Sequence, residues 1–380
     1  MNAEGRSCTR CILPDTYPGI TFNEDGVCNY CQGYAPFHKS LGKEALLELL
    51  RSVGAKKGEY DCIVPISGGK DSTYILYYSV KVLGLRPVAV MHNSGYQHEL
   101  AIANARRACR LLDVPLHEAN TSGWIRRAML KASLRVSAQI NEFWHACGNC
   151  EAIIRTISAR AARAYHTPFI LWGSSALESG DAATYVAYKN LGVDSGHSYP
   201  VFVLKKILHV ISKMRHESGY LKTVRSIIRA HLDPHAIRYS LLSILQRLNI
   251  GFPINYALRP HVVPPFDGLK VRFVHFFDYI EWDSINVIRT LEQELGWVHP
   301  EGRESRWDCA LHCLGNYDCI MRTSVSIEGV NSCNFIREGK MKRDAALEKE
   351  RDILDSISGE CAALIGTLEL KNFRMPIRPE

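Results

Sequence analysis

The chain has 380 residues, of which 46% are hydrophobic and 22% charged, a composition that indicates a globular protein of two or three domains. Its net charge is +7, and no apolar run approaches the roughly 20 residues that cross a bilayer. The opening residues, MNAEGRSCTR, carry no secretion signal, so the sequence predicts a cytoplasmic protein with no membrane association.

Residues 1–36 are dense in cysteine, glycine and proline. They contain two Cys-x-x-Cys pairs, Cys8 with Cys11 and Cys28 with Cys31, separated by sixteen residues. Pairs at this distance are typical of a zinc ribbon, in which four thiolates close a tetrahedral structural site. The sequence therefore predicts a zinc-ribbon-like module here, with four unligated thiols in a loop as the alternative.

Residues 37–200 alternate between strand-like and helix-like segments. Helical periodicity marks residues 43–57 and 96–114, and apolar runs that indicate strands occupy residues 60–66, 86–92, 115–119 and 167–173. This alternation predicts an α/β domain with a doubly wound parallel sheet and helices on both of its faces. Ligands bind such sheets at the carboxyl ends of the strands, so we expect the site there.

The segment SGGKDS, residues 67–72, follows the first predicted strand and precedes a helix. It lacks the Walker spacing, so it is not a loop that transfers a γ-phosphate. Gly68 and Gly69 allow backbone N–H groups to turn toward an anion, and Lys70 adds a positive charge. The following helix offers its positive end to the same anion. The segment predicts a phosphate site, with a glycine-rich turn that binds no ligand as the alternative.

Two further strands end near this loop in the predicted sheet. His92 and Asn93 end the second strand and Gly173 follows the fourth, so we expect the nucleotide between them, with an ordinary turn as the alternative at residues 92–94. A third pair, Cys147 and Cys150, precedes a helical stretch. It leaves open a second metal or cluster, a redox pair and a structural turn.

Residues 201–380 are predicted to form a helical, partly basic C-terminal region. Residues 201–250 hold nine Lys/Arg and two Asp/Glu, so this segment alone carries a charge equal to that of the whole chain. Such a block fits nucleic acid, a phosphorylated substrate, an acidic partner, or the solvated face of helices. The charged loop at 299–308, with His299 and Asp308 at its ends, either contacts the substrate or is solvated.

SGGKDS resembles the signature of the PP-loop ATP pyrophosphatases, which split ATP between its α- and β-phosphates. In that superfamily a substrate carbonyl oxygen takes the AMP, and an amine or sulfur nucleophile then displaces it. The resemblance implies catalytic roles for Lys70 and Asp71 and a magnesium ion on the pyrophosphate. The loop residues implied to bind ATP are Ser67, Gly68, Gly69, Lys70, Asp71 and Ser72. Positive charge on the loop would stabilise the departing pyrophosphate.

The head CTRCILPDTYPGITFNEDGVCNYC, together with SGGKDS, resembles the N-acetyl sugar amidotransferases of surface-polysaccharide biosynthesis, such as that of lipopolysaccharide O-antigen. CGNC before a helix, the strand into WG, and the tail from LGWVHPEGRESRWDC to IREGKMKRDAALEKE extend the resemblance. It implies conversion of an N-acetyl group on a nucleotide-linked sugar to an acetamidino group. The resemblance leads us to expect an acidic residue soon after WG, but this chain has GSSALE there; either Glu178 takes that place or the substrate pocket differs.

The resemblance implies that ammonia comes from a separate glutaminase with a cyclase-like ammonia-channelling subunit, similar to the paired subunits of imidazole glycerol phosphate synthase. The residues agree with an outside source, since Asn2 is no cysteine nucleophile and no Gly-x-Cys-x-Gly elbow occurs. The main alternative is a tRNA sulfurtransferase, in which Cys147, Cys150 and a later cysteine hold an iron–sulfur cluster and the basic block binds nucleic acid. A scaffold with a decayed loop is the third hypothesis, and the intact SGGKDS disfavours it.

Overall fold

A five-stranded parallel sheet organises the chain. The computed structural model describes residues 6–17, 19–34, 40–52, 59–120, 123–140, 149–173, 234–247, 271–299 and 307–368. Within these residues the strand order is β3-β2-β1-β4-β5, and every neighbouring pair is parallel. The strands are β1 (Cys62–Pro65), β2 (Pro87–Asn93), β3 (Leu116–Asn120), β4 (Phe169–Trp172) and β5 (Arg272–His275). The predicted α/β class with a parallel sheet is thereby confirmed.

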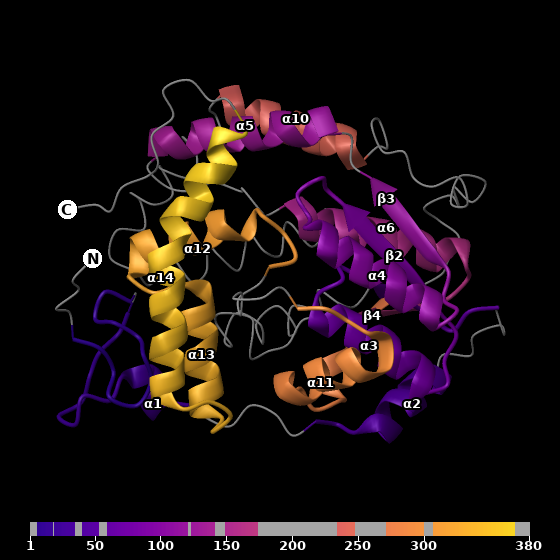
Figure 1. Ribbon diagram of the computed structural model, residues 1–380, viewed down its shortest axis with the longest axis horizontal. Coiled ribbons are helices and arrows are strands. Elements are labelled where there is room, and N and C mark those ends of the chain that lie inside the picture. Colours follow the sequence, from indigo (N-terminus) through magenta and orange to yellow (C-terminus); the bar gives the residue numbers. More distant parts are fainter. Residues whose placement is uncertain are drawn as a thin grey trace.

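Helices cover both faces of this sheet (Figure 1). Val64 and Met91 point to the face covered by α3 (Lys70–Lys81), α4 (Glu99–Leu111) and α11 (Ser284–Leu295). Ile63 and Val90 point to the opposite face, which α6 (Asn149–Ala164) covers. Successive strand residues alternate between faces, so burial of both faces explains why the strands are continuous apolar runs.

The fifth strand and α11 come from the C-terminal region that the sequence predicts to be helical. β5 pairs with β4 in the register Phe169↔Arg272 to Trp172↔His275, and α11 packs against α3. The strand has only four residues and lies inside the aromatic-rich run VRFVHFFDYI. Such a run is too short for its periodicity to distinguish a strand from a buried helix. The sheet therefore includes residues from both sides of the predicted domain boundary at residue 200.

Three C-terminal helices form a second packed unit. They are α12 (His312–Thr323), α13 (Ile327–Arg337) and α14 (Arg343–Gly366), and α13 and α14 run side by side (Figure 1). Ser326 caps α13, because its side chain accepts a hydrogen bond from the Gly329 N–H at 2.8 Å. The remaining described helices are α1 (Asn29–Gln32), α2 (Lys43–Ser52), α5 (Gly123–Ile140), α10 (Pro234–Arg247) and the 3₁₀ turn Phe276–Asp278.

The described part of the basic block is α10, which packs against α5. The rest of residues 201–250 lies outside the described residues. No helix among the residues that the structure describes is both long and apolar enough to cross a membrane.

Candidate functional site

The glycine loop connects β1 to α3. Gly68 has φ +85°, and a Cβ there would lie 1.8 Å from the backbone oxygen of Ala101 on α4, so a side chain at this position cannot be accommodated. Gly69 is the N-cap of α3 and has no side chain to cap the helix. The N-cap therefore supplies no side-chain acceptor to the first turn of this twelve-residue helix, and helix N-termini of this kind suit anions.

Hydrogen bonds hold the loop in this turn. The backbone N–H of Ser67 donates to Ser72 Oγ at 3.1 Å, and the two hydroxyl oxygens lie 3.2 Å apart. The Gly69 N–H donates to Ser67 Oγ at 3.3 Å. From outside the loop, the buried Trp297 donates its Nε1–H to the Gly68 carbonyl at 2.9 Å. The two serine hydroxyls therefore brace the loop itself.

Gly68→Ala is expected to lower the free energy of unfolding by about 3 kcal/mol or more and to abolish ATP turnover, because overlap with α4 adds to backbone strain. Gly84→Ala is the matched control. Gly84 has φ +65°, but a Cβ there meets no atom within 4 Å among the described residues, so we expect a loss of about 1 kcal/mol and normal turnover. Denaturant unfolding and a turnover assay measure both, and equal effects would contradict the close approach.

Lys70 and Asp71, the residues implied to be catalytic, are held together at the start of α3. Asp71 accepts a hydrogen bond from Lys70 Nζ through one oxygen and from Trp282 Nε1 through the other, each at 2.8 Å. Lys70 Nζ also lies 5.0 Å from the centre of a Trp282 ring. Both charged side chains stay partly exposed, so they remain accessible to a ligand. Trp282 precedes α11, and no local motif in the sequence indicated that it would contact Asp71.

A cavity of about 1060 Å³ lies over the loop. Ligand sites for single small molecules measure roughly 300–1,000 Å³, so this cavity lies at the large end of that range. Its walls include the predicted residues Ser67, Gly69, Lys70, Asp71, Ser72, His92 and Gly173. The carboxyl ends of β1, β2 and β4 therefore meet at one cavity. In parallel sheets, ligands bind at these ends of the strands.

The two predicted residues at the end of β2 differ in position. His92 lines the cavity and is only 4% exposed; burial, together with the charge of Arg126, lowers its pKa to about 3, so its imidazole is neutral. Asn93 Oδ1 instead accepts a hydrogen bond from the Gly95 N–H at 2.9 Å, which stabilises the turn. Gln97 lies in the cavity wall and donates to the His92 carbonyl at 2.7 Å.

The far wall of the cavity comes from segments remote in sequence. From the charged loop at 299–308, His299 and Asp308 line the cavity, and residues 300–306 lie outside the described part of the chain. Asp308 pairs with His312 at 3.4 Å. Helix α13 supplies further lining residues that the sequence analysis missed, namely Glu328, Asn331, Ser332 and Phe335. Their spacing in the sequence shows that they share one helix face. It does not show which part of the molecule that face contacts.

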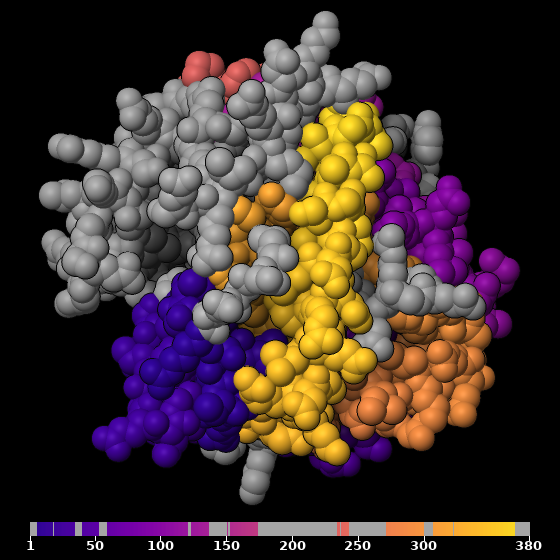
Figure 2. Space-filling model, turned by 60° about the vertical axis from the view of Figure 1, so that its left-hand side comes forward, coloured from indigo at the N-terminus to yellow at the C-terminus, as the bar shows by residue number. Residues whose placement is uncertain are grey.

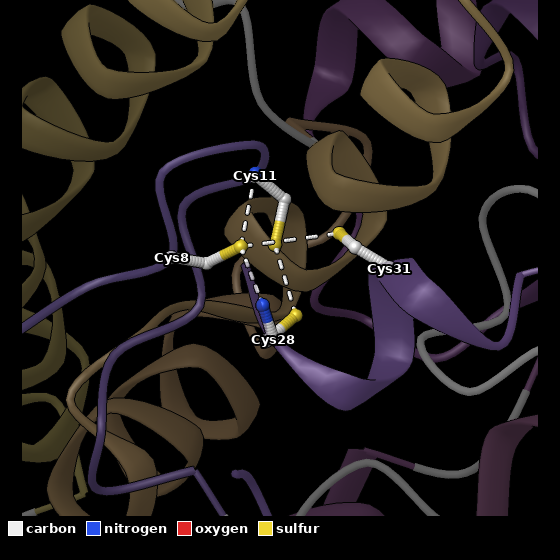
Figure 3. A group of neighbouring side chains, drawn as sticks. All are labelled: Cys8, Cys11, Cys28 and Cys31. Carbon is white, nitrogen blue, oxygen red and sulfur yellow. Dashed lines mark hydrogen bonds between the residues drawn. The ribbon is translucent and has the colours of Figure 1, made fainter. Parts of the chain in front are cut away.

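The four N-terminal cysteines converge in a buried cluster (Figure 3). Their sulfur atoms all lie within 4.8 Å of one another. Cys8 Sγ lies 4.0 Å from Cys31 Sγ, and Cys11 Sγ lies 3.8 Å from Cys28 Sγ. A tetrahedron of thiolates at zinc–sulfur distances of about 2.3 Å has edges of about 3.8 Å. The four cysteines could therefore hold a metal ion such as zinc.

The cluster is tied to its surroundings by hydrogen bonds. The backbone N–H groups of Cys11 and Cys28 donate to Cys8 Sγ at 3.4 and 3.2 Å. Burial opposes ionisation of Cys8, but backbone N–H donors such as these lower its pKa to about 7. Arg337 at the end of α13 places Nε 3.3 Å from Cys31 Sγ, and Arg343 on α14 donates to the Cys11 carbonyl at 3.0 Å.

The cysteine module therefore packs against α13 and α14, the helices that form the far wall of the cavity. Hydrophobic contacts agree, since the four cysteines share one cluster with Val330 and Cys333 of α13 and Ala346 of α14. In Figure 2 the indigo N-terminal residues lie directly against the yellow α14.

The third cysteine pair is described only in part. Cys150 lies in the first turn of α6, and its Sγ accepts a hydrogen bond from the buried Arg126 at 2.6 Å. Cys147 lies outside the described residues. Within those residues, the N-terminal cysteines are the one group of three or more side chains close enough to hold a metal. A second metal or cluster at Cys147 and Cys150 stays a prediction.

Comparison with known proteins adds little to this picture. No family model matches the chain. It is 30% identical over 113 residues to uncharacterized protein MJ1599 of Methanocaldococcus jannaschii, a match covering 29% of this chain and 40% of that protein. The chain thus matches less than half the length of this relative. The molecule is an α/β protein with a parallel sheet, a glycine loop over a large cavity, and four cysteines able to bind a metal ion.

Proposed function

We propose that this protein is an ATP-dependent amidotransferase that acts on the N-acetyl group of a nucleotide-linked sugar. The acetyl carbonyl oxygen attacks the α-phosphorus of ATP, and pyrophosphate leaves. Ammonia then adds to the activated amide carbon, and AMP departs with the former carbonyl oxygen. An acetamidino group remains in which ammonia nitrogen replaces that oxygen, and the protons released pass to solvent. The protein would serve surface-polysaccharide biosynthesis in the cytoplasm.

The observation that carries the proposal is the position of the loop in the wall of a large cavity, where the ends of three strands meet. The N–H groups at the start of α3 and the charge of Lys70 suit the β- and γ-phosphates, where pyrophosphate develops. The partly exposed carboxylate of Asp71 would hold a magnesium ion, which would offset negative charge on the phosphates. The remainder of the cavity, beyond the loop, offers space to the sugar.

The cysteine cluster fits a structural zinc ion, because four thiolates leave no position open for a substrate. When bound, zinc would cross-link the N-terminal segment. Its role would be structural, and the reaction itself would take place at the glycine loop. Arg337 beside Cys31 would offset part of the negative charge of four thiolates.

The source of nitrogen gives a direct test. Incubated with ATP, ammonium and a nucleotide-linked N-acetyl sugar, the protein is expected to form the amidine, detected by mass spectrometry. Glutamine alone should give no product, whereas glutamine with a partner glutaminase should, because a docked partner supplies neutral ammonia, which is scarce at neutral pH, directly to the intermediate. If the sugar stays unmodified while tRNA gains sulfur in an iron-dependent reaction, the protein is a sulfurtransferase instead.

A further inference from the structure

Helix α13 presents a row of side chains to the cavity that the glycine loop also lines. Glu328, Asn331, Ser332 and Phe335 all line the cavity. The last three follow Glu328 by three, four and seven positions, so all four lie on one face of the helix. Three of the four are polar, and all are buried in the structure. Polar groups are rarely buried along a helix face unless something hydrogen-bonds to them.

Glu328 is the member of this row whose partner is missing. Glu328 is 8% exposed, and its Oε2 has no hydrogen-bond partner among the described residues. The neighbouring acid Glu350 differs, because its two oxygens accept hydrogen bonds from the N–H and the hydroxyl of Ser326 at 2.6 and 2.5 Å. A buried acceptor without a donor costs about 1–3 kcal/mol, more if charged. Oε2 itself is shielded from solvent in this structure, so a donor on a ligand would remove that cost once the carboxylate turns toward the cavity that Glu328 lines.

The chemistry of the two ends of the cavity differs. The loop end offers N–H groups and Lys70, which attract phosphate. The α13 end offers a carboxylate, an amide and a hydroxyl. Glu328 would repel a phosphate placed against it, whereas a hydroxyl group can donate to the carboxylate and also bond to the amide of Asn331.

Two lysines also line this part of the cavity, and they bear on which ligand fits. Lys340 is paired with Glu281 at 3.2 Å, and Lys349 lies on α14. Among the described residues, neither lysine hydrogen-bonds to Glu328 Oε2. A neutral group rich in hydroxyls can use cations and carboxylates alike, because each hydroxyl both donates and accepts.

We propose that Glu328, Asn331 and Ser332 bind the ring hydroxyl groups of the substrate, with Glu328 as the acceptor that determines specificity for a hydroxyl-rich ring. The identity of the substrate rests on the proposed amidotransferase function. In this arrangement the sugar lies against α13, and ATP lies against the loop. The cavity wall that contacts the sugar is then the wall that the cysteine module supports.

The test uses Glu328→Gln, which keeps the shape of the side chain and removes its charge. UDP-N-acetylglucosamine is the probe, and saturation-transfer NMR of the full-length protein reports contact with its ring protons. We expect the variant to bind the probe about tenfold more weakly, since a neutral amide oxygen replaces the charged carboxylate as the acceptor. The affinity for ATP, measured by calorimetry, should change less than twofold.

Glu348→Gln is the matched control, because Glu348 is exposed on the neighbouring helix α14. It should leave both affinities unchanged, and thermal unfolding should show that both variants are folded. Unaltered probe binding by Glu328→Gln, or weakened ATP binding instead, would overturn the inference. So would a wild-type protein whose probe shows no ring-proton saturation.

The same measurements separate this inference from the proposed function. If ring protons are saturated in a Glu328-dependent way but no amidine forms with ATP and ammonium, the sugar site stands and the proposed reaction fails. If the amidine forms and Glu328→Gln has an unaltered KM for the sugar, the reaction stands and the site on α13 is wrong.

Discussion

Lys70→Ala is expected to slow the cleavage of ATP to AMP and pyrophosphate by about a hundred- to a thousandfold, the usual effect of removing one group that stabilises transition-state charge. Lys70 lies in the first turn of α3, where its ammonium group adds to the N–H donors of the helix. In the structure Asp71 holds this ammonium at 2.8 Å. Charge that develops on leaving pyrophosphate would strengthen its attraction for Lys70, so the loss should fall on kcat more than on KM.

Lys81→Ala provides the control, because Lys81 is exposed in the last turn of the same helix. It should leave the rate of ATP cleavage unchanged. Both variants should also unfold at nearly the wild-type temperature, since neither lysine is buried. A Lys70→Ala enzyme that retains more than a third of the wild-type rate would contradict a role for this residue at the departing pyrophosphate.

Cys28→Ser is expected to remove the bound metal and to destabilise the protein severely. Structural zinc sites contribute roughly 10–16 kcal/mol of binding energy that is available only to the folded chain. Cys28 Sγ lies 3.8 Å from Cys11 Sγ in a buried cluster that packs on α13 and α14. Loss of the metal should therefore loosen the far wall of the cavity as well as the module itself. Elemental analysis gives the metal content, and thermal unfolding gives the stability.

Cys319→Ser is the matched control for this prediction. Cys319 lies on α12, half-buried, and its Sγ is 3.6 Å from the Thr323 hydroxyl, which a serine can also contact. We expect one zinc ion per chain in the wild type and in Cys319→Ser, and none in Cys28→Ser. Full zinc content in Cys28→Ser would show that these four cysteines do not form the metal site.

The elements that sequence analysis identified are those whose signals are local. β1 to β4 are apolar runs with helices between them, and the glycine loop follows directly from SGGKDS. The cysteine cluster was predictable for the same reason, because two Cys-x-x-Cys pairs bring their own geometry. Each of these features is set by residues within a few positions of one another.

The missed features depend on contacts between distant segments. Trp282 meets Asp71 across 211 positions, and Trp297 meets the Gly68 carbonyl across 229. No periodicity in either segment shows which element its tryptophan will contact. The row on α13 is visible as a pattern, but its place in the cavity that the loop also lines follows only from the packing of the C-terminal helices. β5 was missed because four residues are too few to show a period.

In the proposed reaction, the protein transfers AMP to the oxygen of a substrate amide. The most direct measurement uses a nucleotide-linked N-acetyl sugar carrying heavy oxygen in its acetyl carbonyl, together with ATP and ammonium. Phosphorus NMR of the products then locates the label. We predict AMP that carries the heavy oxygen on its phosphorus, together with unlabelled pyrophosphate. ADP as the nucleotide product, or AMP without the label, would contradict the claim.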